Sequence, residues 1–148
     1  MKGERVAFWD SSALIPLCVR QAQSSRAVQY SDRFQIMVVW WVASLEIQSG
    51  LARLFREGEL SLADKTVALE RLDVMRASWH EIVPVEAVRI LASDLLWNYS
   101  LRTADALQLA AALTWCNKQP HNRPFICFDD RLMSAARQVG FEVFSHVS

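Results

Sequence analysis

Residues 6–12 read VAFWDSS and contain the signal that decides the fold. Residues 6–9 form a short, uninterrupted apolar run, which is typical of a strand buried on both faces of a parallel sheet. The run ends at Asp10, and the two serines that follow are good N-cap residues for a helix over 13–20. This stretch therefore predicts a buried strand that leads directly into a helix.

The same alternation continues along the chain. Apolar runs predict strands at 36–41, 125–128 and 141–144, and a weaker one at 81–85, where a proline limits it to an edge strand or a loop. Apolar periodicity and capping residues predict the helices. One is capped by Ser24 and Ser25 and extends to about Ser31, and another covers 45–56 after a Ser44 cap. The others span 61–79, about 86–98, 103–116 and 130–139. Strands that alternate with helices indicate an α/β fold with a mainly parallel sheet.

Length and composition place limits on the class of protein. The chain has 148 residues, 52% of them hydrophobic and 22% charged, which predicts one globular domain over 1–148 and argues against disorder. No apolar run approaches the ~20 residues of a membrane span, so we expect a cytoplasmic protein. The three cysteines are scattered, which favours buried thiols over a disulfide framework. The net charge of zero neither supports nor excludes a nucleic-acid substrate.

Four acidic residues occupy corresponding places in this pattern. Asp10 and Asp129 each follow an apolar strand, whereas Glu46 and Asp105 lie in the first turn of a predicted helix. Strand ends and the helix starts that follow them share one edge of an α/β sheet, the edge where such folds bind ligands. We therefore expect the four carboxylates to converge.

Converging carboxylates repel one another, and a hard cation removes that repulsion. Mg²⁺ or Mn²⁺ prefers oxygen ligands and retains several waters. Such an ion can polarise a phosphoryl oxygen, activate a water and stabilise a leaving oxygen, which is the chemistry of phosphodiester hydrolysis. The three histidines fall in loop-like or terminal contexts, at positions 80, 121 and 146. Metal-activated water is therefore favoured over a histidine base.

Each acid also has a local interpretation. An Asp or Glu near a helix N-terminus stabilises that helix by capping or through the helix dipole. The metal-site hypothesis therefore depends on the set of four and not on any one of them.

Several neighbouring residues admit two roles. Arg102 and Arg131 could contact phosphates or pair with the nearby carboxylates, and Asp130 is either a solvated helix-start residue or a water-mediated metal ligand. Trp40 and Trp41 could stack on bases or pack in the core. Adjacent strand residues face opposite ways, so at most one of these two tryptophans faces a given surface.

Four stretches of the chain resemble the motifs of PIN-domain nucleases. In chain order they are 8–14 (FWDSSAL), 43–47 (ASLEI), 101–110 (LRTADALQLA) and 128–132 (FDDRL). Their order and approximate spacing agree with that family over essentially the whole chain.

The resemblance implies an α/β/α sandwich with divalent-metal-dependent endoribonuclease activity. It implies that Asp10, Glu46, Asp105 and Asp129 bind the metal. Small stand-alone members of this kind are commonly the toxins of VapBC-type toxin–antitoxin pairs, so the resemblance further implies a homodimer and a small antitoxin that covers the active-site groove.

Other functions are weaker or remain open. A phosphoacceptor receiver domain would need a lysine after a late strand and an acidic pair at its first strand, where residues 6–9 are VAFW. A phosphatase with an Asp-x-Asp motif would need a second acid at position 12, which is Ser12. A non-catalytic binding module on the same fold would be favoured by the loss of one of the four acids, and all four are present. An RNA-processing nuclease without an antitoxin is the remaining alternative. A small neighbouring gene whose product has a DNA-binding N-terminus would favour the toxin.

Overall fold

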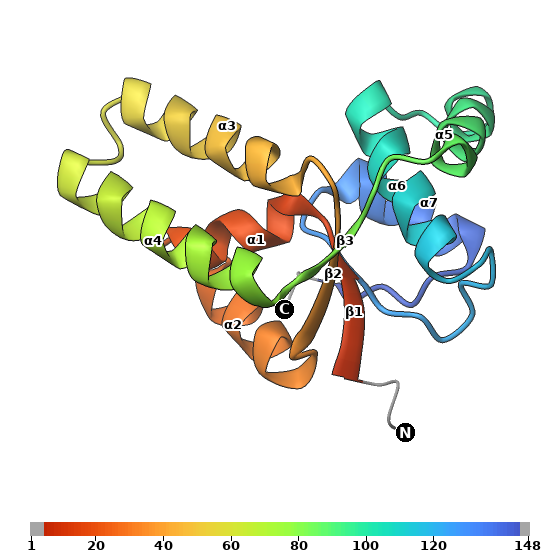
Figure 1. Cartoon of the computed structure of the whole chain (residues 1–148), viewed down its shortest axis with the longest axis horizontal. Helices are drawn as coiled ribbons and strands as arrows, with labels where there is room; N and C mark the ends of the chain where they lie inside the picture. The colour runs from red at the N-terminus through yellow and green to blue at the C-terminus, as the bar shows by residue number, and fades with distance from the viewer. Residues whose placement is uncertain (1–4, 146–148) are drawn as a thin grey trace.

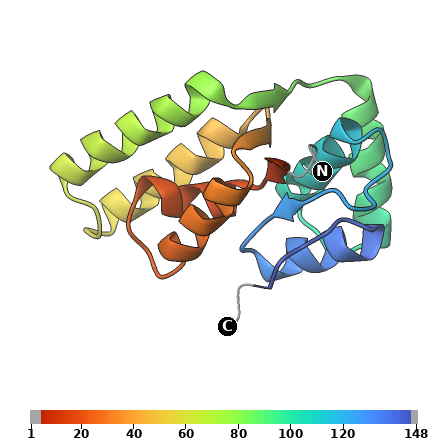
Figure 2. The ribbon, with the colours of Figure 1, turned by 90° about the horizontal axis from the view of Figure 1, so that it is seen from below.

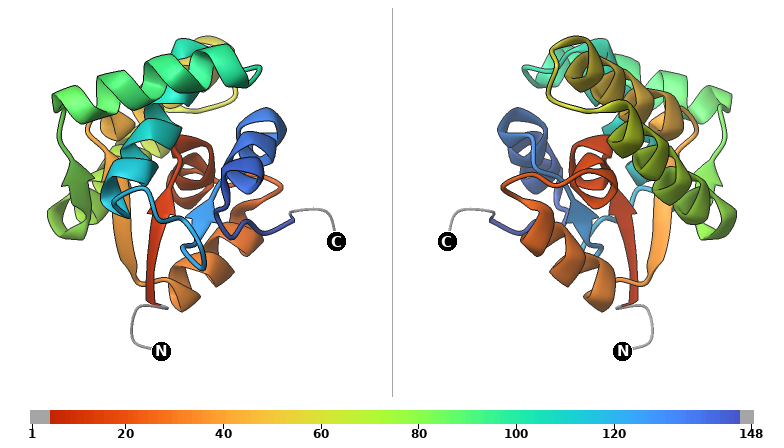
Figure 3. Two further views of the ribbon diagram at one scale, coloured as in Figure 1. Left: turned by 90° about the vertical axis from the view of Figure 1, so that its right-hand side faces the viewer. Right: turned by 90° about the vertical axis from the view of Figure 1, so that its left-hand side faces the viewer.

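A four-stranded parallel sheet separates two layers of helices in the computed structural model, which describes residues 5–145 (Figure 1). The strands are β1 (Val6–Trp9), β2 (Ile36–Trp40), β3 (His80–Ile82) and β4 (Phe125–Ile126). The helices are α1 (Ser11–Cys18), α2 (Ser24–Arg33), α3 (Ala43–Arg56), α4 (Leu62–Ser78), α5 (Glu86–Asn98), α6 (Thr103–Trp115) and α7 (Asp130–Val139). The strand order is β3-β2-β1-β4, which can be followed from green to blue in Figure 3. The prediction of an α/β fold with a parallel sheet is confirmed.

Alternate residues of the strands pack into two separate cores. Phe8 and Val38 face α5, α6 and α7, whereas Ala7, Trp9 and Val39 face α1 to α4. Figure 2 shows these two groups of helices on opposite sides of the sheet. Because both faces of the short strands are covered, the strands read as continuous apolar runs in the sequence. The α/β/α sandwich that the sequence predicted is confirmed.

The pairing between β1 and β4 brings distant parts of the chain together. Phe8 lies opposite Phe125, and Trp9 lies opposite Ile126. One residue further on, the backbone N–H of Asp10 donates to the carbonyl of Ile126 over 2.9 Å. The carboxyl end of β1 is therefore held beside the segment that leads to Asp129.

The predicted strand over 141–144 is wrong. Glu142 forms an isolated parallel bridge with Pro124, and the N–H of Phe125 donates to the Glu142 carbonyl over 2.9 Å. The reason is that β4 ends at Ile126, two residues earlier than predicted, so a strand beside it has little backbone to pair with. Gly140, with φ of 117°, ends α7 and turns the chain back toward β4.

Three helix starts also differ from the prediction. Helix α2 begins at Ser24 and its N-cap is Gln23, so neither Ser24 nor Ser25 caps it. Helix α1 begins at Ser11, and its cap is Asp10, because the Asp10 carboxylate accepts from the N–H of Ser12. Helix α3 begins at Ala43, so Ser44 lies buried inside the first turn and does not cap it. Strand β3 stops before Pro84 and lies at the sheet edge, as the proline predicted. Across residues 5–145, no helix has the length and apolar character needed to cross a membrane.

Candidate active site

Asp10 lies at the carboxyl end of β1 and is almost fully buried, with 5% of its surface exposed. Its Oδ2 accepts hydrogen bonds from the backbone N–H of Ser12, over 3.1 Å, and from the Ser12 hydroxyl. The Cys127 thiol also donates to Oδ2 over 3.7 Å. One carboxylate oxygen of Asp10 is thus used for local structure, while Oδ1 accepts no hydrogen bond from any residue between 5 and 145.

Glu46 lies in the first turn of α3 and connects the two helical layers. Its Oε1 accepts from the Ser11 hydroxyl of α1 over 3.1 Å and from the Gln108 amide of α6 over 2.5 Å. Helices α1 and α6 cover opposite faces of the sheet. Glu46 is therefore held at the sheet edge where the two layers meet.

Asp105 and Asp129 each accept one backbone hydrogen bond at the start of a helix. Asp105 Oδ2 accepts from the N–H of Arg102 over 3.4 Å, and Asp129 Oδ1 accepts from the N–H of Leu132 over 2.9 Å. Asp105 is half-buried, whereas Asp129 is exposed. The local capping interpretation therefore holds for both residues, and each still has a second oxygen that these bonds do not use.

Charge repulsion links Asp10 with each of the other three carboxylates and contributes to the raised pKa values of Asp10 and Glu46. Burial raises the pKa of Asp10 to about 6, and the charges of Asp105 and Asp129 add to that effect against the opposing Ser12 hydrogen bonds. Burial and then the Asp10 charge raise the pKa of Glu46 to about 7, opposed by its Gln108 and Ser11 hydrogen bonds.

The pKa of Asp105 is also raised, first by burial and then by Asp129. The Arg102 N–H and the charges of Arg102 and Arg131 oppose this shift. The structure therefore brings all four sequence-predicted acids together at one edge of the sheet, with the two arginines near Asp105.

The chemistry of this group suits a hard divalent cation. All four side chains offer oxygen ligands, the preferred donors of Mg²⁺ and Mn²⁺. The raised pKa values of Asp10 and Glu46 reflect charge that burial and like-charged neighbours destabilise, and a cation would relieve this. Within residues 5–145, no three His, Cys, Asp or Glu side chains already form a group that could hold a metal ion. The residues therefore fit a cation by type and location but do not form a ready-made cage.

The sequence did not indicate the side chains that hold these acids in place. Ser12 and Cys127 contact Asp10, while Ser11 and Gln108 contact Glu46. Burial raises the pKa of the Cys127 thiol well above its usual range, so the thiol keeps its proton and can donate it to a hydrogen bond. These four residues read as ordinary helix-start or core residues, and only the spatial proximity of their elements reveals their contacts.

The two neighbouring tryptophans differ in exposure, as predicted, although β2 ends at Trp40, one residue short of the predicted strand end, and Trp41 lies in the turn that follows. Trp40 is buried in the core that faces α5, α6 and α7, whereas Trp41 is 51% exposed. Trp40 is therefore a packing residue and is excluded as a base-stacking platform.

No family model matches the chain. Ribonuclease VapC46 of Mycobacterium tuberculosis (strain ATCC 25618 / H37Rv) is 30% identical over 139 residues, which cover 93% of this chain and 95% of that protein.

Two solved structures share the fold at low sequence identity. A toxin–antitoxin complex from Klebsiella pneumoniae has a TM-score of 0.63 at 16% identity, covering 86% of this chain and 90% of that chain. The crystal structure of FitAcB from Neisseria gonorrhoeae has a TM-score of 0.64 at 16% identity, covering 95% and 97%. The architecture, with its parallel sheet and two helical layers, is therefore shared beyond recognisable sequence similarity.

Proposed function

Because the chain belongs to the VapC family of PIN-domain ribonucleases, we propose that it is a divalent-metal-dependent endoribonuclease and the toxin of a toxin–antitoxin pair. The observation that carries this proposal is the set of four acids from distant segments, Asp10, Glu46, Asp105 and Asp129. Three of these carboxylates have pKa values raised by burial and by the charge of other members of the set. Acids with a purely structural role are not expected to lie where burial and the charges of other acids destabilise their ionised forms.

In this proposal, the four carboxylates bind one or two Mg²⁺ or Mn²⁺ ions. A bound ion of this kind supplies an activated water and stabilises the charge that develops on the phosphate. Asp10 and Glu46 each offer an oxygen that accepts no hydrogen bond from residues 5–145, so binding an ion requires no existing bond to break. Arg102 and Arg131 are exposed and lie near Asp105, where they can contact the RNA phosphates.

The first expected result is RNA cleavage that needs a divalent ion and no nucleotide cofactor. Purified protein is incubated with single-stranded and structured RNA in Mg²⁺, in Mn²⁺ or in chelator, and the products are resolved on a gel. We expect cleavage in either ion and none in chelator. Cleavage that persists in chelator would overturn the metal mechanism, whereas no cleavage in any ion would favour a non-catalytic module.

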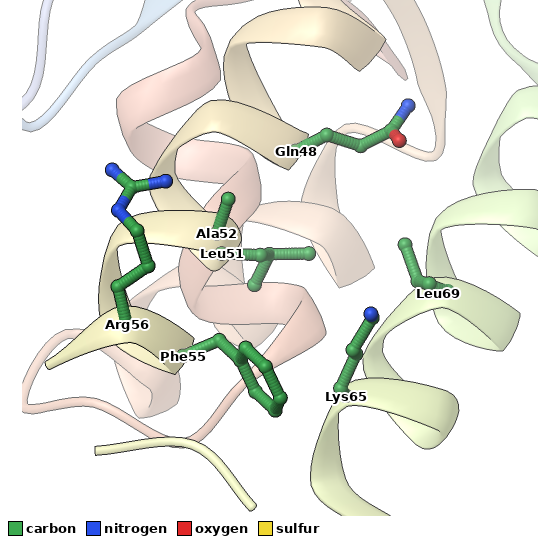
Figure 4. Close-up of a pocket in the computed structure, with 7 residues that line it drawn as sticks. All are labelled: Gln48, Leu51, Ala52, Phe55, Arg56, Lys65 and Leu69. Carbon is green, nitrogen blue, oxygen red and sulfur yellow. The ribbon is translucent and has the colours of Figure 1, made fainter. Parts of the chain in front are cut away.

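The antitoxin part of the proposal is supported by a groove between α3 and α4. These two helices form a hairpin that projects from the sheet in Figures 1 and 2. The groove has a volume of about 410 Å³ and an apolar floor formed by Leu51, Ala52, Phe55 and Leu69. Lys65 and Arg56 line it as well, and Figure 4 shows Lys65 of α4 across the groove from Phe55 of α3.

The chemistry of this groove indicates what would bind there. Lys65 Nζ lies 5.0 Å from the centre of the Phe55 ring, and Phe55 is 40% exposed. An amphipathic helix with apolar residues toward Phe55 and acidic residues toward Lys65 and Arg56 would complement both features. Gln48 is the groove residue nearest in sequence to Glu46, and it lies on a different face of α3. We propose that the partner continues beyond the groove to the acids, where a basic side chain could neutralise them. Self-association of the chain stays a prediction.

The second expected result is that changing the groove weakens the partner complex without affecting cleavage. Phe55→Asp places a charge on the apolar floor, and we expect it to weaken binding of the neighbouring gene's product by at least tenfold, about 1.4 kcal/mol. Binding is measured by calorimetry, and inhibition by the RNA assay. Ile90→Asp, at an exposed position of α5, serves as the matched control. Equal loss of binding in both variants would place the partner elsewhere.

A further inference from the structure

A buried amide of α6 contacts one member of the acidic set. Gln108 is 1% exposed, and its Nε2 donates to Glu46 Oε1 over 2.5 Å. It follows Asp105 by three positions, so it lies about one turn further along the same helix. We infer that Gln108 is a positioning residue, which together with Ser11 holds the Glu46 carboxylate by Oε1 and leaves Oε2 for the cation. This inference rests on the proposed function.

The surroundings of Gln108 show that packing alone does not explain this amide. Its neighbours in α6 are buried apolar residues, namely Ala106, Leu109, Ala110 and Ala111. The Gln108 Oε1 atom is buried and has no hydrogen-bond partner among residues 5–145. A buried carbonyl without a partner is unfavourable, and a methionine of similar length would avoid that penalty. The Gln108 amide therefore satisfies one specific acceptor, Glu46, while its own acceptor is left unpaired.

The orientation of the amide follows from the same contact. A carboxylate oxygen accepts hydrogen bonds and repels another acceptor, so the Nε2 side of the amide must face Glu46. Gln108 approaches from the layer that holds α6, and Ser11 approaches from the layer that holds α1. Two donors from opposite faces of the sheet thus converge on one oxygen, which restricts rotation of the Glu46 carboxylate.

This restraint matters because glutamate has three rotatable side-chain bonds. A free glutamate loses that conformational freedom when it binds an ion, and the loss weakens binding. Residues that hydrogen-bond to a metal ligand orient it beforehand, and their removal typically lowers metal affinity roughly 10–100-fold. The inference predicts an effect of that size at Gln108, although Gln108 would not itself contact the ion or the RNA.

The experiment measures Mn²⁺ binding and cleavage in matched variants. Gln108→Met keeps the length of the side chain and removes the donor, while Leu109→Met changes the next buried residue of α6, which has no hydrogen bond to the acids. Mn²⁺ binding is followed by calorimetry and by electron paramagnetic resonance of the free ion. We expect Gln108→Met to bind Mn²⁺ roughly 10–100-fold more weakly. We expect Leu109→Met to bind it as wild type does.

Kinetics provide a second readout that a general packing defect would not reproduce. In Gln108→Met, the Mn²⁺ concentration for half-maximal cleavage should rise, while the KM for RNA stays unchanged and kcat recovers at saturating Mn²⁺. Wild-type Mn²⁺ affinity in Gln108→Met, or equal weakening in Leu109→Met, would overturn the inference. If Gln108→Met does not fold, Ser11→Ala decides, because it removes the other donor to the same oxygen. Unchanged Mn²⁺ affinity in Ser11→Ala would then reject the inference. Absence of Mn²⁺ binding in the wild type would instead reject the proposed function.

Discussion

Asp10→Asn should abolish RNA cleavage and, at the same time, make the metal-free protein more stable at pH 8. Asparagine has the same shape and is an equally good N-cap, so the hydrogen bonds from Ser12 can persist. The substitution removes a charge that burial destabilises. Burial raises the pKa of Asp10 from 3.8 to about 6, and only 5% of the residue's surface is exposed. At about 1.4 kcal/mol per unit, the expected gain in the free energy of unfolding is about 3 kcal/mol.

The pH dependence of this effect has a definite sign. Between pH 4 and pH 6, folded Asp10 holds its proton while the unfolded chain has already lost it. The unfolded state binds fewer protons in that window, so the stability of the metal-free protein falls as the pH rises through it. The raised pKa of Glu46, about 7, extends the fall to about pH 7.

Thermal and urea unfolding in chelator from pH 4 to pH 8 would measure both effects. The curve of Asp10→Asn should be flatter than that of the wild type, and the two should diverge most at high pH. Asp32→Asn, at an exposed position of α2, is the control and should follow the wild type. If Asp10→Asn is instead less stable than the wild type at pH 8, the ionised Asp10 carboxylate stabilises the fold and burial does not destabilise its charge.

Added Mg²⁺ or Mn²⁺ should stabilise the wild type strongly and Asp105→Asn only weakly. An ion that binds the folded state alone adds about 1.4 kcal/mol at ten times its dissociation constant and about 2.7 kcal/mol at one hundred times. Asp105 makes one long cap bond of 3.4 Å, and burial and Asp129 raise its pKa. In chelator, Asp105→Asn should therefore be at least as stable as the wild type.

Melting both proteins across an ion titration provides the measurement. A purely local role at the helix start predicts a different pattern, in which the variant loses a few tenths to ~1 kcal/mol at every ion concentration. Equal responses of wild type and Asp105→Asn to the ion would remove Asp105 from the proposed ligand set.

The sequence was sufficient for most of the fold because its signals there are local. The apolar runs that end at Trp9 and Trp40 predict buried strands, and the helix over 130–139 ends before a glycine. The acids were found by position alone, since the edge of a parallel sheet follows from where its strands end. The single domain, the homodimer and the cytoplasmic location stay predictions.

The remaining features depend on contacts between segments that are distant in the sequence. Gln108 lies 62 positions from Glu46, and its pattern in α6 is that of a core residue. The same limit explains the error at 141–144, where alternating residues suit a strand but β4 is too short to pair with one. Pairing partners are set by the assembled sheet and cannot be read from one segment.

The attachment of β4 has a consequence for how long the four acids of the proposed active site stay together. Two residue pairs join β4 to β1, and Asp129 lies three residues beyond the last residue of β4. Short edge elements open locally at a smaller free-energy cost than global unfolding. Detachment of this edge would separate Asp129 from Asp10 while β1, β2 and β3 remained paired. The rate at which this edge opens then sets how long the four acids stay together. During each opening, the rest of the fold stays intact although the set of acids is incomplete.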